Sequence, residues 1–323
     1  MNHQVRIYKS GSPVVLSYEK VASSIGEPGN GQVRIRHDAI GLNFVDTMFR
    51  DGTFDVPLPF SMGVEGAGVV ESVGPDVVNF SVGDRVAYFF SFGAYSDTRL
   101  IDAEALVKLP GDISTMQAAA LITKGFTAWM LLKRVHVIQP GEKVLIHGAA
   151  GGVGTLLAPW AKALGADVIA TVGSSAKVMD VQKHGIEHVL SSADVDLAKK
   201  VRQITQGQGV DVVYELVGRA TFGASVMALR DGGHLIHAGN ASGHPVVDRE
   251  ALAAMSIRYD QPSTAQYVKG HDELALATSD LFDAVRRGIF GEIKAARYPL
   301  RDVVRAHEDL AARRISGSAI LIP

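Results

Sequence analysis

The residues with the clearest chemical potential form a glycine-rich turn between an apolar run and an amphipathic segment. Residues 144–146 are apolar, residues 147–154 read His-Gly-Ala-Ala-Gly-Gly-Val-Gly, and the amphipathic segment covers residues 156–164. A strand, a glycine turn and a helix in this order form the βα unit that binds dinucleotides. The N–H groups and partial positive charge at the start of such a helix suit a pyrophosphate.

The glycines of this turn have different predicted tasks. Gly148 allows the tight turn, Gly151 lets the backbone approach the phosphate, and Gly154 lets the helix pack closely on the strand. Gly152 and Val153 complete the turn. The spacing is Gly-x-x-Gly-x-x-Gly rather than the strict Gly-x-Gly-x-x-Gly, so a glycine-rich turn without a ligand is the alternative interpretation.

The end of the next apolar run bears on the choice of nicotinamide cofactor. An NAD site usually has a carboxylate about 20 residues beyond the glycine motif, where it binds the ribose 2′-hydroxyl. Here residues 167–172 are followed by Gly173, Ser174 and, three residues later, Lys177, with no carboxylate at the end of the run. Ser174 and Lys177 could donate to a 2′-phosphate, which favours NADPH. A solvated lysine at the start of a helix is the alternative.

Composition limits the classes of protein to which the chain can belong. At 323 residues it is long enough for two cores, since single cores rarely exceed roughly 250–300 residues. A hydrophobic fraction of 47% and a net charge of −2 indicate a globular protein and give no reason to expect nucleic acid as the main partner. No apolar run approaches the roughly 20 residues of a membrane span. The absence of cysteine excludes disulfides, and with no apolar N-terminal signal we expect a cytoplasmic protein.

Residues 1 to about 120 are predicted to form a compact, barrel-like β domain. The predicted strands, separated by Gly, Pro, Asp or Asn, are Gln4–Ile7, Val14–Ser17, Gln32–Ala39, Gly66–Val73, Asp84–Phe89 and Tyr95–Ile101. Near residue 113 the hydrophobic period changes, and two helices are expected at Ser114–Leu121 and Thr127–Lys133.

From Val144 onward, strands alternate with helices. The predicted strands are Val144–His147, Asp167–Thr171, His188–Leu190, Val210–Leu216 and Gly233–Ala238, with helices near 153–164, 175–184, 194–206 and 220–229. This alternation predicts an α/β, doubly wound parallel sheet with helices on both faces. After Pro262 we expect helices at 272–287 and 301–312 and a strand at Ser318–Ile322, which return to complete the first domain.

Several short motifs carry a family resemblance. In chain order they are Asn43-Phe-Val-Asp46, Gly63-Val-Glu-Gly-Ala-Gly68, Gly83-Asp-Arg-Val86, Ala119-Ala120, Lys124-Gly-Phe-Thr127 and the glycine turn. With this ordered set the chain resembles the zinc-independent quinone oxidoreductases of the medium-chain dehydrogenase/reductase superfamily, the group that includes ζ-crystallin. The resemblance runs nearly end to end.

The resemblance implies a fold and an assembly. It implies a GroES-like β-barrel catalytic domain over residues 1–122, a Rossmann NADPH-binding domain over 123–262, and a return segment over 263–323. An NADPH cleft lies between the two domains in this family, and a homodimer is usual. The resemblance also implies a small-molecule quinone as the substrate.

The family's site residues transfer to matching positions in this chain. Asn43, Asp46 and Thr127 would face the nicotinamide and its ribose, beside Phe44. The remaining cofactor positions are Gly173, Ser174, Lys177 and Ser192 near the 2′-phosphate, Gly239 and Asn240 at the nicotinamide end, and Arg313 reaching back from the C-terminal segment. As alternatives, Asp46 could cap a short helix, Thr127 could make a local backbone bond, and Arg313 could be a surface charge.

Departures from related enzymes narrow the chemistry. Zinc alcohol dehydrogenases of the superfamily carry a cysteine near residues 43–46 and a histidine just before Glu65, whereas this chain has no cysteine and has Val64 there. No metal site is therefore expected. Relatives that reduce alkenes use a tyrosine as proton donor, but Phe44 and Met48 carry no hydroxyl, and with Phe60 they form either an apolar wall or part of the core.

These observations favour an NADPH-dependent quinone reductase. The alternatives are an NADPH-dependent reductase of enones or 2-alkenals, and a non-catalytic, crystallin-like NADPH-binding protein.

Overall fold

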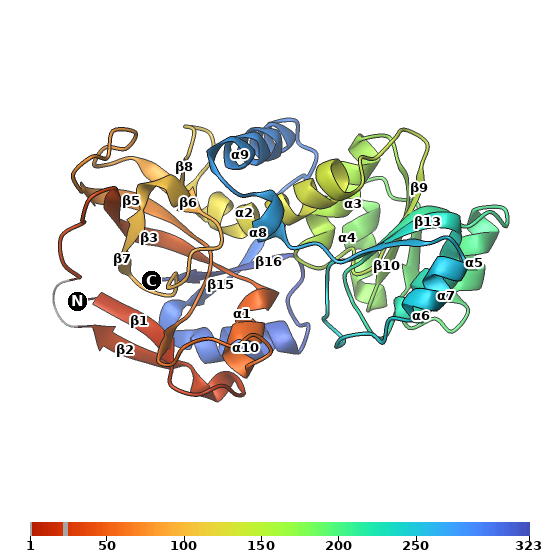
Figure 1. Ribbon diagram of the computed structural model, residues 1–323, viewed down its shortest axis with the longest axis horizontal. Coiled ribbons are helices and arrows are strands. Elements are labelled where there is room, and N and C mark those ends of the chain that lie inside the picture. The colour runs from red at the N-terminus through yellow and green to blue at the C-terminus, as the bar shows by residue number, and fades with distance from the viewer. Residues whose placement is uncertain (1, 22–24) are drawn as a thin grey trace. The chain divides into compact units, whose positions relative to one another are not determined.

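The structure, a computed structural model, describes residues 2–21 and 25–323. Its contacts divide the chain into two compact units (Figure 1). Unit 1 comprises the chain up to Thr123 together with Ile293–Pro323, and unit 2 is the continuous stretch Lys124–Glu292. The chain passes from unit 1 to unit 2 within helix α2 (Thr115–Met130).

Unit 1 is built mainly from strands. Its strands are β1 (Asn2–Ile7), β2 (Ser17–Val21), β3 (Gln32–Leu42), β4 (Phe60–Ser61), β5 (Gly66–Val73), β6 (Arg85–Tyr88), β7 (Thr98–Asp102), β8 (Leu106–Lys108), β15 (Ala295–Pro299) and β16 (Ser318–Ile322). Its helices, besides the start of α2, are α1 (Phe44–Asp51), α10 (Val303–Ala311) and the short 3₁₀ turns η1 (Pro13–Val15), η2 (Ala103–Ala105) and η5 (Leu300–Asp302).

The long strand β3 organises unit 1. It pairs antiparallel with β5, β7 and β16 in a seven-stranded sheet. Six of these strands have the order β15-β16-β3-β5-β6-β8, and the seventh, β7, pairs with β3 off this path. Strands β2, β1 and β4 form a second sheet. The strand alternates buried and less buried residues over much of its length, with Val33 and Ile35 fully buried in the core. Strand β16 pairs Ala319 with Leu42 of β3, so the returning segment supplies an interior strand.

One predicted strand in unit 1 is wrong in its local structure. The expected strand Val14–Ser17 is instead η1 followed by the start of β2, because Pro13 has a fixed φ and no N–H for a strand ladder. The segment after Asn43 forms helix α1, the short helix that the alternative interpretation of Asp46 allowed.

Unit 2 alternates strands and helices. Its strands are β9 (Lys143–Ile146), β10 (Asp167–Val172), β11 (His188–Ser191), β12 (Val210–Glu215), β13 (Leu229–His237) and β14 (Arg258–Asp260). Its helices are the rest of α2, the π-helix η3 (Leu131–Val135), α3 (Gly154–Ala163), η4 (Ser175–Lys177), α4 (Val178–Gln182), α5 (Leu197–Ile204), α6 (Phe222–Ala228), α7 (Arg249–Ala254), α8 (Thr264–Tyr267) and α9 (His271–Arg286).

The sheet of unit 2 is parallel and has the order β11-β10-β9-β12-β13-β14. This is the Rossmann order 3-2-1-4-5-6, and the direction of progression reverses between β9 and β12. In Figure 1, α3 and α4 lie on one side of the sheet and α5, α6 and α7 on the other. The prediction of a doubly wound parallel sheet beside a separate, mainly antiparallel domain is confirmed. Ligands of such folds bind at the carboxyl ends of the strands beside the reversal.

The contacts place one stretch differently from the predicted boundaries. We expect residues 263–292 in the return segment, but they group with unit 2. The reason is helix α9, which packs on α2: Asp280 accepts a hydrogen bond of 2.7 Å from Trp129 Nε1, and Leu281 fills the space beside Gly125. The return to unit 1 begins at Ile293.

Candidate active site

The glycine turn after β9 packs tightly against its own backbone. Gly148 has a φ of +68°, in the left-handed region that glycine adopts without strain. A Cβ at Gly154 would lie 2.2 Å from the carbonyl oxygen of Gly148 and 2.7 Å from Ala149 Cα. Only glycine at position 154 therefore lets α3 begin this close to the turn, which matches the predicted tasks of both glycines.

The turn also offers backbone donors at the start of α3. Gly151 N–H donates to the Gly148 carbonyl at 2.9 Å, and Thr155 N–H donates to the Gly151 carbonyl at the same distance. Between them, the N–H groups of Gly152 and Val153 donate to no acceptor within the described residues, and both residues are half-exposed. Two unused donors at the positive end of a helix fit a pyrophosphate.

The predicted 2′-phosphate residues gather where β10 and β11 end. The strands are parallel neighbours, Ser192 N–H donates to the Val172 carbonyl at 2.9 Å, and a Cβ at Gly173 would lie 3.9 Å from Ser192 Oγ. Ser174 Oγ accepts from Ala176 N–H at 3.3 Å, which starts the turn that carries Lys177.

The carboxylate just beyond β11, Asp194, is paired with a lysine, so its negative charge is offset and does not repel a phosphate at this site. Asp194 pairs with Lys200, and the hydrogen bond from Lys200 holds the pKa of the Asp194 carboxyl below its usual range. Exposed Ser174 and half-buried Lys177 therefore remain the polar groups at the end of β10 that suit a 2′-phosphate.

Gly239 and Asn240 lie in the loop after β13. Gly239 N–H donates to the backbone carbonyl of Glu215 at 3.1 Å. His237 Nε2 lies 2.9 Å from Asn240 Oδ1 and 3.1 Å from the Gly239 carbonyl, while His237 Nδ1 lies 3.0 Å from Tyr259 Oη. An Nε2–H tautomer satisfies these contacts, since Nε2 then donates and Nδ1 accepts from the Tyr259 hydroxyl.

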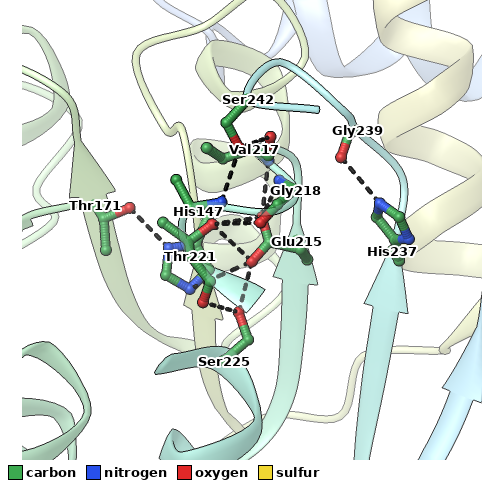
Figure 2. A network of polar contacts seen from close by, with 11 residues as sticks. His147, Thr171, Glu215, Val217, Gly218, Thr221, Ser225, His237, Gly239 and Ser242 are labelled. Atoms are coloured by element: carbon green, nitrogen blue, oxygen red, sulfur yellow. Dashed lines mark hydrogen bonds and ion pairs between the residues drawn. The ribbon is translucent and has the colours of Figure 1, made fainter. Parts of the chain in front are cut away.

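A buried carboxylate stands at the reversal of strand order, at the end of β12 (Figure 2). Glu215 is fully buried. Its Oε1 accepts from the N–H groups of Val217 and Gly218 at 2.8 and 2.9 Å, and Thr221 Oγ1 lies 2.8 and 2.9 Å from its two oxygens. Ser225 Oγ donates to Oε2 at 2.6 Å. The carboxylate thereby fixes the loop after β12 and the start of α6.

His147 lies beside this carboxylate at the end of β9. Its Nδ1 is 3.0 Å from Thr171 Oγ1, and its Nε2 is 3.9 Å from Glu215 Oε2 without a hydrogen-bond partner (Figure 2). Burial lowers the pKa of His147, and the charge of Glu215 opposes that shift. The imidazole is therefore neutral at pH 7. It is a buried structural residue directly before the glycine turn.

Thr127, the predicted nicotinamide contact of unit 2, lies on α2. It is half-buried, and its Oγ1 lies 3.0 Å from Thr264 Oγ1 on α8. The hydroxyl is thus positioned by a side chain far along the sequence. Its role toward a cofactor stays a prediction.

In unit 1 the predicted residues surround the start of α1. Asp46 Oδ2 accepts from Asn43 N–H at 2.8 Å, so Asp46 caps α1, as the alternative interpretation had it. Asn43 Nδ2 donates to Glu65 Oε2 at 2.8 Å, and Glu65 Oε1 accepts from Thr123 N–H at 2.7 Å. Asn43, Asp46 and Glu65 are buried, whereas Phe44 is 38% exposed.

Behind Asp46, a buried chain of polar side chains ends in a cation. The Tyr95 hydroxyl donates to Asp46 Oδ2 at 3.0 Å, His307 Nε2 lies 3.1 Å from that hydroxyl oxygen, and Arg50 Nη1 lies 3.1 Å from His307 Nδ1. Because a guanidinium only donates, His307 accepts at Nδ1 and donates from Nε2. Burial, and then the charge of Arg50, lower the pKa of His307 to about 3. A neutral histidine and a tyrosine therefore bridge a cation and an anion.

Arg313 belongs to the C-terminal stretch of unit 1. It is exposed, follows the end of α10 and has a φ of +57°. Its predicted reach to the cofactor stays a prediction. Across residues 2–21 and 25–323, no group of three or more His, Cys, Asp or Glu side chains could hold a metal ion, and no helix is long and apolar enough to cross a membrane.

Comparison with known proteins identifies the family. A model of the alcohol dehydrogenase GroES-like domain matches residues 29–111, and a model of the zinc-binding dehydrogenases matches residues 152–266. A 2-haloacrylate reductase of a Burkholderia species is 41% identical, with 98% of each chain covered. A quinone oxidoreductase of Pseudomonas aeruginosa is 39% identical, with 100% of each chain covered. The structure of Escherichia coli quinone oxidoreductase complexed with NADPH superposes with a TM-score of 0.95 at 38% identity, covering 99% of this chain and 100% of that one.

The chain belongs to the quinone oxidoreductases of the medium-chain dehydrogenase/reductase superfamily. One of the two matching family models is described as zinc-binding, but this chain contains no cysteine that could bind zinc.

The sequence analysis of this quinone oxidoreductase family member missed several groups that shape the site. Asp46 is supported by Tyr95 and His307, which come from distant parts of the chain and carry no local pattern, and by Arg50, whose i, i+4 spacing from Asp46 on one helix was the available signal. Glu65 had a signal, because Gly41 on the neighbouring strand leaves room for it: a Cβ at Gly41 would lie 2.0 Å from Glu65 Oε2. Glu215 had one too, as a carboxylate ending an apolar run.

Proposed function

We propose that this protein is an NADPH-dependent quinone reductase that transfers reducing equivalents from NADPH to a quinone without a metal. The observation that carries this conclusion is the end-to-end likeness to a quinone oxidoreductase structure complexed with NADPH. The glycine turn and the end of β10 supply donors of the kinds that such a cofactor requires.

Each part of unit 2 has a separate task toward the cofactor. The N–H groups of Gly152 and Val153 bind the pyrophosphate, and Ser174 and Lys177 bind the 2′-phosphate. Gly239 and Asn240 line the nicotinamide end. Bound NADPH supplies the hydride, and the protein contributes orientation and exclusion of water.

The residues around α1 suit a flat, apolar acceptor. Phe44 exposes part of its ring, and Asp46 and Glu65 hold Asn43 in place through its backbone N–H and its side-chain amide. Neither Phe44 nor Met48 carries a hydroxyl that could protonate carbon. A quinone needs no such donor, because solvent can protonate its oxygens.

Reduction of an activated alkene is the second candidate. The specific observation in its favour is the 41% identity to a 2-haloacrylate reductase over 98% of both chains. Hydride addition to such an alkene needs a proton at the adjacent carbon, and a bound water would have to supply it.

The test is NADPH oxidation followed at the nicotinamide absorbance with 1,4-benzoquinone, 9,10-phenanthrenequinone, 2-hexenal and 2-chloroacrylate as acceptors. Turnover with quinones that persists in the presence of a chelator is the expected result. Turnover with 2-hexenal or 2-chloroacrylate alone, giving a saturated product, would establish the second candidate instead. NADPH binding without turnover on any acceptor would contradict both and leave the crystallin-like alternative.

A variant of Lys177 tests the identity of the cofactor. Lys177→Ala should raise the KM for NADPH about tenfold, the effect of losing one charge-assisted hydrogen bond, and leave the KM for NADH unchanged. Lys183→Ala is the matched control. Lys177 lies just before helix α4 and Lys183, an exposed lysine, lies just after it. Equal effects of Lys177→Ala on both cofactors would refute recognition of the 2′-phosphate by Lys177.

Assembly and location complete the proposal. A homodimer is usual in the family, and β14 lies at the edge of the six-stranded sheet, where a second copy can pair. Size-exclusion chromatography with light scattering tests this. The lack of cysteine is compatible with a cytoplasmic location, and the net charge of −2 gives no support to a role in nucleic-acid binding.

A further inference from the structure

The loops that follow β12 and β13 are tied to one another. The Val217 carbonyl accepts from Ser242 N–H at 2.7 Å and from Ser242 Oγ at 2.8 Å, and Arg219 N–H donates to the Gly243 carbonyl at 2.9 Å. The second loop, residues 238–243, contains Gly239 and Asn240. A shift of the first loop must therefore shift the residues predicted to line the nicotinamide.

Close packing leaves no room for one loop to move alone. A Cβ at Gly239 would lie 2.2 Å from the Leu216 carbonyl oxygen, and a Cβ at Gly218 would lie 2.4 Å from that of Gly243. Val217 also lies against the glycine turn, since a Cβ at Gly148 would be 3.3 Å from Val217 Cγ2. Contacts this close transmit small displacements.

Glu215 holds the first loop in place from below. Its carboxylate accepts the N–H groups of Val217 and Gly218, and its backbone carbonyl accepts those of Ala238 and Gly239 at 2.9 and 3.1 Å. One residue thus binds both loops, the first through its side chain and the second through its main chain. Figure 2 shows the carboxylate beneath the loop that carries Val217 and Gly218.

The charge of Glu215 is held without a cation in contact. Among the described residues its one ion-pair neighbour is His147, at 3.9 Å, and that imidazole is neutral at pH 7. Burying a carboxylate costs stability unless hydrogen bonds compensate for the lost water. Thr221 and Ser225 join the two N–H groups in doing so (Figure 2). Four donors converging on one buried acceptor define a single loop geometry.

We propose that Glu215 is a positioning residue for the nicotinamide half of the cofactor. Its carboxylate fixes the position of Val217 and Gly218 in the first loop. The first loop in turn fixes the position of the second loop, which contains Gly239 and Asn240. This inference rests on the proposed use of NADPH and on the proposed place of these two residues. The 2′-phosphate residues at the ends of β10 and β11 take no part in the Glu215 network, so the adenosine half should bind independently of Glu215.

The test measures binding rather than turnover. The Kd values of NADPH and of 2′,5′-ADP, which lacks the nicotinamide, are determined by calorimetry for the wild type and for Glu215→Gln. Glu215→Gln keeps the size of the side chain and one acceptor oxygen. We expect the Kd of NADPH to rise about tenfold, the equivalent of one lost hydrogen bond, while that of 2′,5′-ADP is unchanged.

Two further variants separate positioning from a general loss of stability. Thr221→Val removes a hydroxyl that contacts both oxygens of Glu215 and should weaken NADPH binding in the same selective way. Thr205→Val is the control: Thr205 is also buried and holds a loop through Gly209 N–H, but at the amino end of β12. This control should lower the melting temperature and leave both Kd values unchanged.

The outcomes are distinguishable. Equal weakening of NADPH and 2′,5′-ADP by Glu215→Gln, or no weakening of either, would overturn the positioning role. If Glu215→Gln does not fold, the same comparison in Thr221→Val decides the matter. Failure of the wild type to bind NADPH at all would instead overturn the proposed function.

Discussion

Asp46 in unit 1 and Glu215 in unit 2 are both buried carboxylates among residues predicted to contact ligand, and their charges are compensated differently. Asp46 in unit 1 accepts from a backbone N–H and from Tyr95, and the polar chain behind Tyr95 ends at Arg50. Glu215 in unit 2 accepts only backbone N–H groups and hydroxyls.

The difference shows two ways to keep a negative charge in a core. In unit 1 the charge is balanced by Arg50, which lies four residues beyond Asp46 on α1 and is connected to it through Tyr95 and neutral His307. Helix α1, which carries both ions, is thereby linked to α10, which carries His307. In unit 2, oriented dipoles balance it locally, so the carboxylate defines a loop. The first arrangement ties remote parts of the chain together, and the second shapes one turn.

The largest expected effect is on stability when each charge is removed. Asp46→Asn should lower the free energy of unfolding by about 3 kcal/mol, because it removes the negative end of a buried polar chain whose other end is the Arg50 guanidinium, on which the carboxylate of Asp51 then acts without Asp46. Glu215→Gln should cost only about 1 kcal/mol, because no buried cation depends on it. Urea denaturation of both variants at pH 7 measures the difference.

A double variant provides the control for this comparison. Asp46→Asn combined with Arg50→Met removes both charges, so its loss should be smaller than the sum of the two single losses. Equal losses for Asp46→Asn and Glu215→Gln would show that Arg50 does not depend on Asp46, and the distinction between the units would fail.

The second largest expected difference between the units is in how their buried histidines, His307 and His147, make the stability depend on pH. The pKa of His307 is lowered to about 3 in the folded protein, against about 6.5 unfolded, so the unfolded chain binds the proton first. This contribution is complete above pH 6.5 and is lost as the pH falls toward 3, by about 1.4 kcal/mol per pH unit. His307→Gln should therefore flatten the dependence measured by urea denaturation between pH 7 and pH 5.

The corresponding variant in unit 2 sharpens the contrast. The pKa of His147 is also lowered by burial, but Glu215 opposes the shift, whereas Arg50 reinforces the shift of His307. His147→Gln should flatten the dependence less than His307→Gln. The reverse order would mean that Glu215 does not act on His147, or Arg50 on His307, as described.

The smallest expected difference concerns single hydroxyl groups. Tyr95→Phe leaves His307 Nε2–H without an acceptor and should cost about 1.5 kcal/mol. Ser225→Ala should cost less, about 0.5 kcal/mol, because Glu215 keeps Val217, Gly218 and Thr221 as donors. Thermal denaturation monitored by circular dichroism is sensitive enough to rank them. A cost for Ser225→Ala equal to that of Tyr95→Phe would contradict the proposed redundancy around Glu215.

Features set by neighbouring residues could be predicted from the sequence. The glycine turn was predictable because the steric demands at Gly148 and Gly154 arise within seven residues of chain. The absence of an acid at the end of β10 is likewise a local fact. The alternation that gives the parallel sheet could also be predicted, because the central strands β9, β10 and β12 are mostly buried and apolar.

Features set by distant residues could not be predicted. Two helices were expected, at Ser114–Leu121 and Thr127–Lys133. Instead α2 runs through the stretch between them as one helix, and Leu281 of α9 packs against Gly125 there. The support of Asp46 is similar, since Tyr95 and His307 stand 212 positions apart and neither has a periodic or spacing signal. Such partners are chosen by topology, which a single sequence does not display.

The division of unit 1 into two stretches of chain has a consequence for the order of folding during synthesis. Unit 2 is continuous, so all its strands are available once residue 292 has emerged from the ribosome. The sheet of unit 1 receives β16 only after residue 322 has been made, and until then β3 lacks its partner along Ile40–Leu42. The unit that carries Asn43 and Asp46, which are predicted to face the nicotinamide, is therefore begun before unit 2 and completed after it.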